Sequence, residues 1–134
     1  MADRKVIYKN HCTPQEKVNF SGGANDGRWY LDSDAGRKLT GIANIDLDTF
    51  VYNTDVAVST AANIPTPYTG NDFLFIKNLG GGGGADVHIA LDATNYKIVI
   101  SPGESFASKV ITGVSAKIKC LASDSTCEIL TGKS

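Results

Sequence analysis

The segment from Asp72 to Phe106 constrains the fold of this chain more than any other. It holds three β-type runs, at 73–76, 87–91 and 98–100, which are separated by a tract of five glycines and by the sequence Asp-Ala-Thr-Asn. These intervals leave little room for a helix. The second interval is typical of a turn, because Asp and Asn side chains bond the nearby backbone. The spacing therefore predicts antiparallel strands that follow one another as a meander.

The alternation of apolar and polar residues continues outside this segment. Ile45 and Leu47 share one face of a predicted strand, and Asp46 and Asp48 lie on its other face. Residues 116–120 and 127–130 predict a closing hairpin. About eight to ten short strands with almost no helical periodicity predict an all-β fold, either an antiparallel β-sandwich or a small barrel.

Residues 1–40 follow no such regular pattern. Short β-like pieces are interrupted at 21–23 and 25–27, where glycine and asparagine tolerate the positive φ of tight turns. Pro14 favours a short helix that begins after Thr13, because proline suits the first helical position. A length of 134 residues suits one core, so we divide the chain into an irregular N-terminal arm, 1–40, and a β-sandwich domain, 41–134.

Composition argues against two classes of partner. The net charge is −1 and no basic stripe is present, so we expect no nucleic acid partner. We expect no membrane partner either, because about 18 consecutive apolar residues are needed to span a bilayer and the chain has no such run. The N-terminal sequence has no apolar run after its charges, so we expect no secretory signal and a cytoplasmic site of synthesis.

The three cysteines are an odd number, which argues against a disulfide framework. Cys120 and Cys127 flank a predicted turn, and both fall on core-facing positions, so their thiols are expected to face each other. We favour buried, reduced thiols over a disulfide, because nothing in the sequence indicates an oxidising compartment.

The glycine tract, Gly80–Gly84 followed by Ala85, matches the pattern of a phosphate-binding loop. A dinucleotide site needs that loop to open a helix, whose N-terminus holds the pyrophosphate. Here the tract opens a predicted strand that begins near Val87. We therefore interpret it as a mobile hairpin loop without a fixed shape.

Metal and catalytic patterns are weak. Asp32 and Asp34 resemble the start of a calcium loop, but Ala43 stands where the bidentate glutamate belongs. His11 and His88 are the only histidines, and neither has a second ligand at metal-site spacing. We expect no catalytic residue, no metal and no cofactor, although a small β-barrel enzyme stays open as a third hypothesis.

Aromatic residues provide one candidate binding site. Trp29, Tyr30 and Tyr68 could form a platform for stacking on sugar rings, which would make the chain a carbohydrate-binding β-sandwich or a receptor-binding tip. The competing interpretation of Trp29 is that it anchors the core, as large aromatic side chains usually do.

Three motifs carry a family resemblance. These are the strand sequence Phe-Leu-Phe-Ile-Lys-Asn at 73–78, the sequence Val-His-Ile-Ala-Leu-Asp at 87–92 after the glycine tract, and Pro-Gly-Glu at 102–104. With the closing segments at 116–119 and 126–130, they resemble small β-sandwich virion proteins of tailed bacteriophages. The resemblance covers residues 72–132, and its motifs are structural rather than catalytic.

The resemblance implies a jelly-roll-like, non-enzymatic structural protein of a virion. It would act as a capsid decoration or cement protein, or as a neck or tail accessory, by binding other virion proteins. It also implies a homo-oligomer, a trimer by family analogy, that is made in the host cytoplasm. Such proteins work through contact area and avidity, so the function would lie in surfaces rather than in a pocket.

Overall fold

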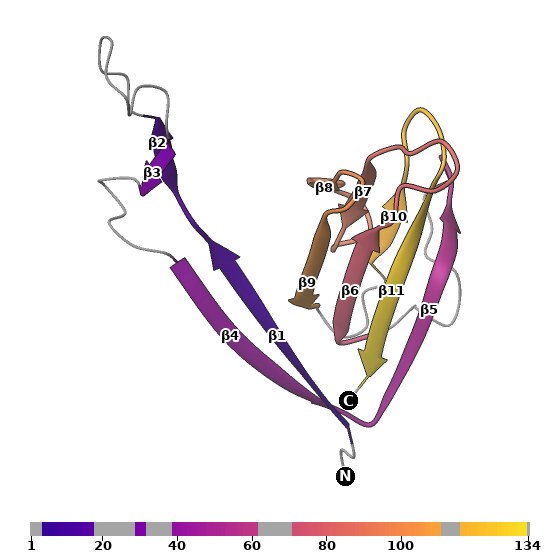
Figure 1. The fold of residues 1–134 in the computed structure, drawn as a ribbon. Helices are drawn as coiled ribbons and strands as arrows, with labels where there is room; N and C mark the ends of the chain where they lie inside the picture. The colour runs from indigo at the N-terminus through magenta and orange to yellow at the C-terminus, as the bar shows by residue number, and fades with distance from the viewer. Residues whose placement is uncertain (1–3, 18–28, 32–38, 62–70, 111–115, 134) are drawn as a thin grey trace, which may run out of the picture. The chain divides into compact units, whose positions relative to one another are not determined.

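The computed structural model describes residues 4–17, 29–31, 39–61, 71–110 and 116–133 (Figure 1). Every helix or strand assigned within these ranges is a β-strand, which confirms the predicted all-β fold. Accordingly, the described ranges hold no helix with the length and hydropathy needed to cross a membrane. The chain divides into two compact units, residues 7–44 on the one hand and residues 1–6 with 45–134 on the other. The predicted boundary at residue 40 stays a prediction.

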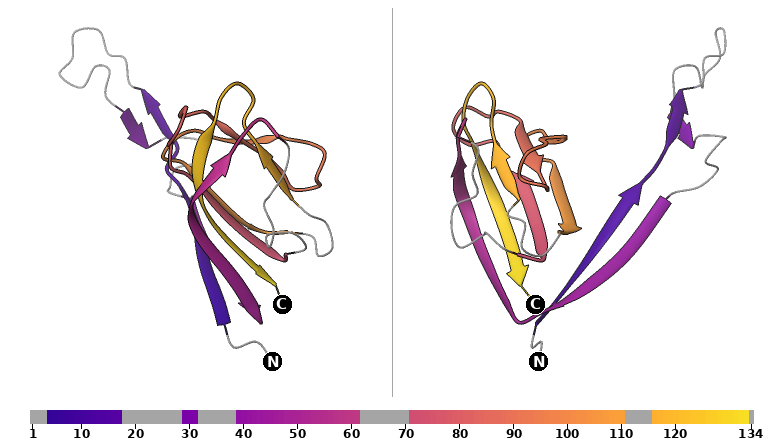
Figure 2. Two further views of the ribbon diagram at one scale, coloured as in Figure 1. Left: turned by 90° about the vertical axis from the view of Figure 1, so that its right-hand side faces the viewer. Right: turned by 180° about the vertical axis from the view of Figure 1, so that it is seen from behind.

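The larger unit contains a two-layer antiparallel β-sandwich (Figure 2). The large sheet has the strand order β5-β11-β6-β9, and the small sheet has the order β10-β7-β8. The bounds are Thr49–Val58 for β5, Phe73–Asn78 for β6, Val87–Ala90 for β7, Ile98–Ile100 for β8, Ser105–Lys109 for β9, Lys117–Lys119 for β10 and Ser125–Lys133 for β11. All pairs within the two sheets are antiparallel.

The path of the chain between the sheets differs from the predicted meander. The glycine tract carries the chain from β6 in the large sheet to β7 in the small sheet, so it is not a hairpin loop. The predicted closing hairpin is also wrong, because β10 pairs with β7 whereas β11 pairs with β5 and β6. Of the predicted turns, the one at 92–95 does join paired strands, β7 and β8.

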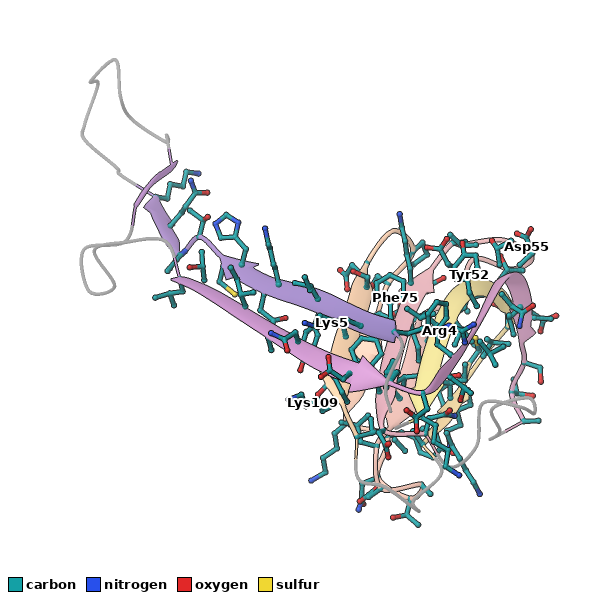
Figure 3. The ribbon with its side chains drawn as sticks, turned by 90° about the horizontal axis from the view of Figure 1, so that it is seen from below. Arg4, Lys5, Tyr52, Asp55, Phe75 and Lys109 are labelled. Atoms are coloured by element: carbon teal, nitrogen blue, oxygen red, sulfur yellow. The ribbon has the colours of Figure 1, made fainter. Side chains whose placement is uncertain are left out.

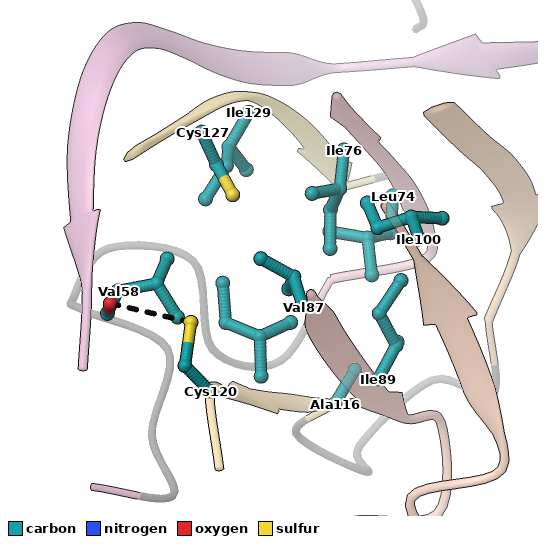
Figure 4. Close-up of a cluster of buried hydrophobic side chains, with 11 residues drawn as sticks. Val58, Leu74, Ile76, Val87, Ile89, Ile100, Ala116, Cys120, Cys127 and Ile129 are labelled. Atoms are coloured by element: carbon teal, nitrogen blue, oxygen red, sulfur yellow. Dashed lines mark hydrogen bonds between the residues drawn. The ribbon is translucent and has the colours of Figure 1, made fainter. Parts of the chain in front are cut away.

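The core lies between the two sheets, where the inward side chains of both meet (Figure 4). Ile76 and Ile129 are cross-strand partners in the large sheet, and Ile89 and Ile118 are partners in the small sheet. All four are fully buried. Each such side chain contributes about 1.5–3 kcal/mol when it is removed from water, which makes this cluster the main source of stability of the sandwich.

The N-terminal strands are more regular than their sequence predicts. The strand β1, Arg4–Cys12, pairs with β4, Leu39–Leu47, and the two form a ribbon that we call the β1–β4 ribbon. The strand β2, Gln15–Lys17, pairs antiparallel with β3, Trp29–Leu31. The helix predicted after Thr13 is therefore wrong: a ladder of backbone hydrogen bonds overrides the weak helix-start signal of one proline.

Candidate functional site

The described residues do not test the predicted sugar platform. Tyr68 lies outside them, and for Trp29 and Tyr30 only the backbone is described. Both residues belong to β3, where Trp29 pairs with Lys17 and Tyr30 with Glu16. The platform stays a prediction.

The described residues contain no group of three His, Cys, Asp or Glu side chains that could hold a metal ion. His11 lies in β1 with its Nε2 3.4 Å from the Thr13 hydroxyl. His88 lies in β7, half-buried, between Val99 and Lys119 on the neighbouring strands. Asp32 and Asp34, the candidate calcium ligands, fall outside the described residues.

A shallow hollow of about 280 Å³ lies beside the glycine tract. Its lining includes Asp86, His88 and Ser123, the residue types of a hydrolytic triad. A nucleophile needs a base within hydrogen-bond reach, and that base needs an orienting acid. In the described structure none of these three side chains forms a hydrogen bond to another. The hollow therefore has the residue types of a triad but not its contacts.

Each glycine of the tract that borders this hollow stands where a side chain is disfavoured. Gly80, Gly82 and Gly84 have φ values of 75°, 62° and 65°, which side chains disfavour. At the two glycines between them, space is the constraint. A Cβ atom on Gly83 would lie 2.7 Å from Oγ of Ser123, and one on Gly81 would overlap Oγ1 of Thr126. The tract therefore alternates between glycines needed for conformation and glycines needed for space.

Asn78 holds this crossover together from inside the protein. Its side chain is fully buried, and its Nδ2 donates to the carbonyl oxygens of Ala85 at 2.9 Å and Ile100 at 3.0 Å. Its Oδ1 accepts from the Gly80 N–H at 3.0 Å and from the Ser125 hydroxyl at 2.6 Å. One amide thus joins the end of β6, the glycine tract, β8 and β11. This residue was noted in the sequence only as part of a strand motif.

The two cysteines near the C-terminus are buried in the core, as predicted, and both are free thiols (Figure 4). The Cys120 Sγ lies 3.5 Å from the carbonyl oxygen of Val58. Burial, and secondarily the nearby Cys120 thiol, raise the pKa of Cys127 to about 12. The pKa of Cys120 is also raised, mainly by burial.

These environments predict selective thiol chemistry. At pH 8 in the native protein, the exposed Cys12 should react with a thiol reagent, whereas Cys120 and Cys127 should react only after denaturation. Because the folded pKa of Cys127 is raised, its neutral form supports the fold below pH 9. That support should be lost as the pH rises from about 9 towards 12, since the unfolded chain ionises first. Counting reactive thiols with and without urea tests the first expectation, and a count of three in the native state would contradict it.

The outer face of the large sheet, the face directed away from the small sheet, carries an open apolar surface. One cross-strand row consists of Tyr52, Leu130, Phe75 and Ala107, taken from β5, β11, β6 and β9 in turn. Figure 3 labels Tyr52 and Phe75 of this row. Tyr52 is 53% exposed, and the other three are half-buried. The next row towards the glycine tract places Glu128 beside Lys77.

The other end of this face is covered by the chain itself. Leu47 is fully buried and lies over Gly132, where even a Cβ atom would overlap its side chain. The guanidinium of Arg4 lies 4.8 Å from the centre of the Phe50 ring, a cation–π contact. As far as the described residues show, the open part of the outer face is therefore the part around Tyr52, Leu130 and Phe75.

A β-bulge shapes the edge of the same face. The register between β5 and β11 shifts between Cys127 and Ile129, and Asp55 on the bulged strand has a φ of 57°. The Tyr52 hydroxyl donates to Oε2 of Glu128. This hydrogen bond, with smaller effects of desolvation and of the Glu128 and Asp55 charges, raises the pKa of Tyr52. Near the bulge, the carboxylates of Glu128 and Asp55 therefore both act on Tyr52.

Comparison with known proteins adds no identification. No family model, curated protein or solved structure matches this chain.

Sequence reasoning did not find the outer face, although part of its signal was visible. The four consecutive apolar residues of Phe73–Ile76 are typical of a strand that is covered on both faces. Phe75 is only half-buried, so that pattern contained a residue of an open surface. The alternation in β11 was likewise visible, but it does not show which strands flank β11.

Proposed function

We propose that this chain is a non-enzymatic structural protein of a bacteriophage virion, a capsid decoration, neck or tail accessory protein that binds other virion proteins. The single observation that carries the proposal is the β1–β4 ribbon, a long and largely exposed pair of strands. The residues that would serve catalysis in the hollow beside the glycine tract form no hydrogen bonds to one another, so surface binding fits the described structure better than chemistry does.

The β1–β4 ribbon exposes apolar side chains that favour a partner. Ile7 is 63% exposed and Ile42 is 69% exposed, and both belong to the unit of residues 7–44. A two-stranded hairpin is marginally stable in water by itself. In the described part of the chain the ribbon has only its own two strands, so both of its outer edges offer backbone groups for pairing. Docking on a neighbouring protein would satisfy those edges and bury the isoleucines.

The strand order of the sandwich supports the same proposal. The strands of the sandwich can be renumbered along the chain so that β5 is the first, β6 the third and β11 the eighth, with the second number left unused. The large sheet then has the order first-eighth-third-sixth. The small sheet then reads seventh-fourth-fifth. This order agrees with part of the strand order of a jelly roll, which supports the jelly-roll-like fold that we propose.

Jelly rolls occur in both viral capsid and lectin domains, so a jelly-roll-like fold would not by itself choose between a virion protein and a carbohydrate-binding module. The ribbon favours the virion protein, because its exposed groups are strand edges and aliphatic side chains rather than a sugar platform. We further propose synthesis in the host cytoplasm, which suits the free thiols, and self-association within the particle.

A substitution in the ribbon tests this function. The double variant Ile7→Ser/Ile42→Ser should reduce incorporation of the tagged chain into particles by about tenfold or more, because it removes two apolar contacts worth more than 1.4 kcal/mol together. Incorporation is measured by quantitative mass spectrometry of phage particles that are purified by density gradient from cells expressing the tagged chain.

Thr40→Ser is the matched control, since Thr40 lies in the exposed part of β4 and its replacement removes one methyl group. It should be incorporated like the unmodified chain. If the unmodified chain is absent from purified particles, the proposed function is wrong. Binding to a glycan array that is lost in Trp29→Ala, with the fold retained, would favour the carbohydrate-binding module instead.

A further inference from the structure

The outer face of the large sheet has a pattern that its own copy would complement. In the row nearest its centre, the register places Leu130 beside Phe75, with Tyr52 and Ala107 at the two ends. In the next row, Glu128 and Lys77 are direct neighbours, again on β11 and β6. The line between β11 and β6 therefore divides each row into two unlike halves. In the first row the halves differ in side-chain size, and in the second row they differ in the sign of the charge.

We propose that two copies of this chain pack these outer faces against each other about a two-fold axis that runs along the boundary between β11 and β6. The proposal rests on the proposed function in that it gives the self-association of the virion protein a surface. Rotation about this axis exchanges β11 with β6 and β5 with β9. It is an isologous contact, in which the same surface is used by both copies.

The rotation brings complementary groups together. Leu130 of one copy meets Phe75 of the other, so two apolar side chains become covered. Tyr52, the largest exposed side chain of the row, meets Ala107, the smallest. Glu128 of each copy meets Lys77 of the other, which gives two opposite-charge contacts. Face-to-face packing of two sheets at about 10 Å, with their strands nearly aligned, is a common arrangement of β-sheets.

The charges select this axis over the alternative that lies across the strands. An axis across the strands at the Leu130 row would place Glu128 and Lys77 over the end of the face that Leu47 covers. Glu128 of one copy would then no longer meet Lys77 of the other copy. With the proposed axis, Arg4 of one copy, which contacts Phe50 of the edge strand β5, approaches Lys109 of the edge strand β9 of the other copy. These like charges lie at the edge of the contact, where salt screens them.

The open surface is small, so the contact belongs to the weak class of interfaces. Part of the face is already covered by Leu47 and Arg4. We therefore expect a dimer that forms at micromolar concentration and that is strengthened when other contacts hold many copies on one particle.

Charge exchange tests the contact. By sedimentation equilibrium, the unmodified chain should form dimers, and Lys77→Glu or Glu128→Lys alone should weaken the dimer at least about tenfold. An equimolar mixture of the two variants should recover dimers, because each like-charge contact becomes an opposite-charge contact. The double variant Lys77→Glu/Glu128→Lys should also form dimers with itself, but it should not pair with the unmodified chain.

Lys97→Glu, an exposed charge in the loop between β7 and β8, is the matched control and should leave the dimer unchanged. A chain that stays monomeric at about 0.5 mM would overturn the contact, as would one that forms only trimers. A mixture no better than the single variants, with circular dichroism showing all of them folded, would also overturn it.

The experiments can disprove the virion role and the two-fold contact independently of each other. If the chain is found in particles but the charge variants behave like the unmodified chain, the virion role stands and the two-fold contact is wrong. If the charge exchange works and the chain is absent from particles, the contact stands and the virion role is wrong.

Discussion

Asn78→Leu should lower the free energy of unfolding by about 3–5 kcal/mol, because several buried polar groups lose their partner together. Leucine has the same branching and the same number of side-chain heavy atoms, and its larger methyl groups leave no cavity, so most of the loss arises from hydrogen bonds. The carbonyl oxygens of Ala85 and Ile100 lose their donor, and the Gly80 N–H and the Ser125 hydroxyl lose their acceptor. Each unsatisfied buried group costs about 1–3 kcal/mol, and partial relaxation keeps the total below the full sum.

Urea unfolding monitored by circular dichroism measures this change. Asn44→Ala is the control, since Asn44 is exposed in β4 and its replacement should change the free energy by no more than about 0.5 kcal/mol. Asn78→Asp is informative as well, because it keeps the acceptor for Gly80 and Ser125 but removes the donor to the two carbonyls. A loss below about 1 kcal/mol for Asn78→Leu would mean that water or neighbouring groups replace the network.

Local patterns in the sequence predicted local structure well. The turn at 92–95 is an example, because the reason for it is contained in four residues. The Asp92 carboxylate accepts from the backbone N–H groups of Asn95 at 2.7 Å and Thr94 at 3.0 Å. These bonds, the Asn95 backbone bond most of all, lower the pKa of Asp92. The Pro-Gly-Glu turn is similar, since the Glu104 N–H bonds the Ser101 carbonyl at 2.9 Å.

Partners that are distant in sequence could not be predicted in the same way. Period-two alternation shows which face of a strand is buried, but it does not show which strand lies beside it. The segments at 116–120 and 127–130 have the right lengths for a hairpin, yet each pairs with strands much earlier in the chain. A two-layer sandwich requires this, because both segments must place their apolar sides towards the same core from opposite layers.

The candidate site shows the same limit. The outer face takes one or more residues from each of four strands, and their order β5-β11-β6-β9 is not the order of the sequence. Tyr52 and Glu128 are 76 residues apart, and their contact has no local signal. The glycine tract was visible as a motif, but its role depends on Ser123 and Thr126, which the fold brings to it.

Gly83→Ala should lower the free energy of unfolding by about 1–3 kcal/mol, an overpacking cost. The added Cβ would lie 2.7 Å from Oγ and 2.8 Å from Cβ of Ser123, and 3.1 Å from the carbonyl oxygen of Asp124. The last contact is with backbone, which cannot move aside as a flexible side chain can. Ser123→Gly in the same chain should recover part of the loss, because it removes two of the three close contacts.

Two other glycines separate this steric effect from conformational strain. Gly82→Ala meets Asp124 at an ordinary 3.6 Å, so its cost of about 1–2 kcal/mol should come from the φ of 62° alone and should not be recovered by Ser123→Gly. Gly41→Ala meets no atom within 4 Å and should be neutral or slightly stabilising. If all three alanines were neutral in urea unfolding, the tract would be the loose loop that its composition predicts. A graded order with Gly83 first would instead mean that the crossover between the sheets is a packed part of the sandwich.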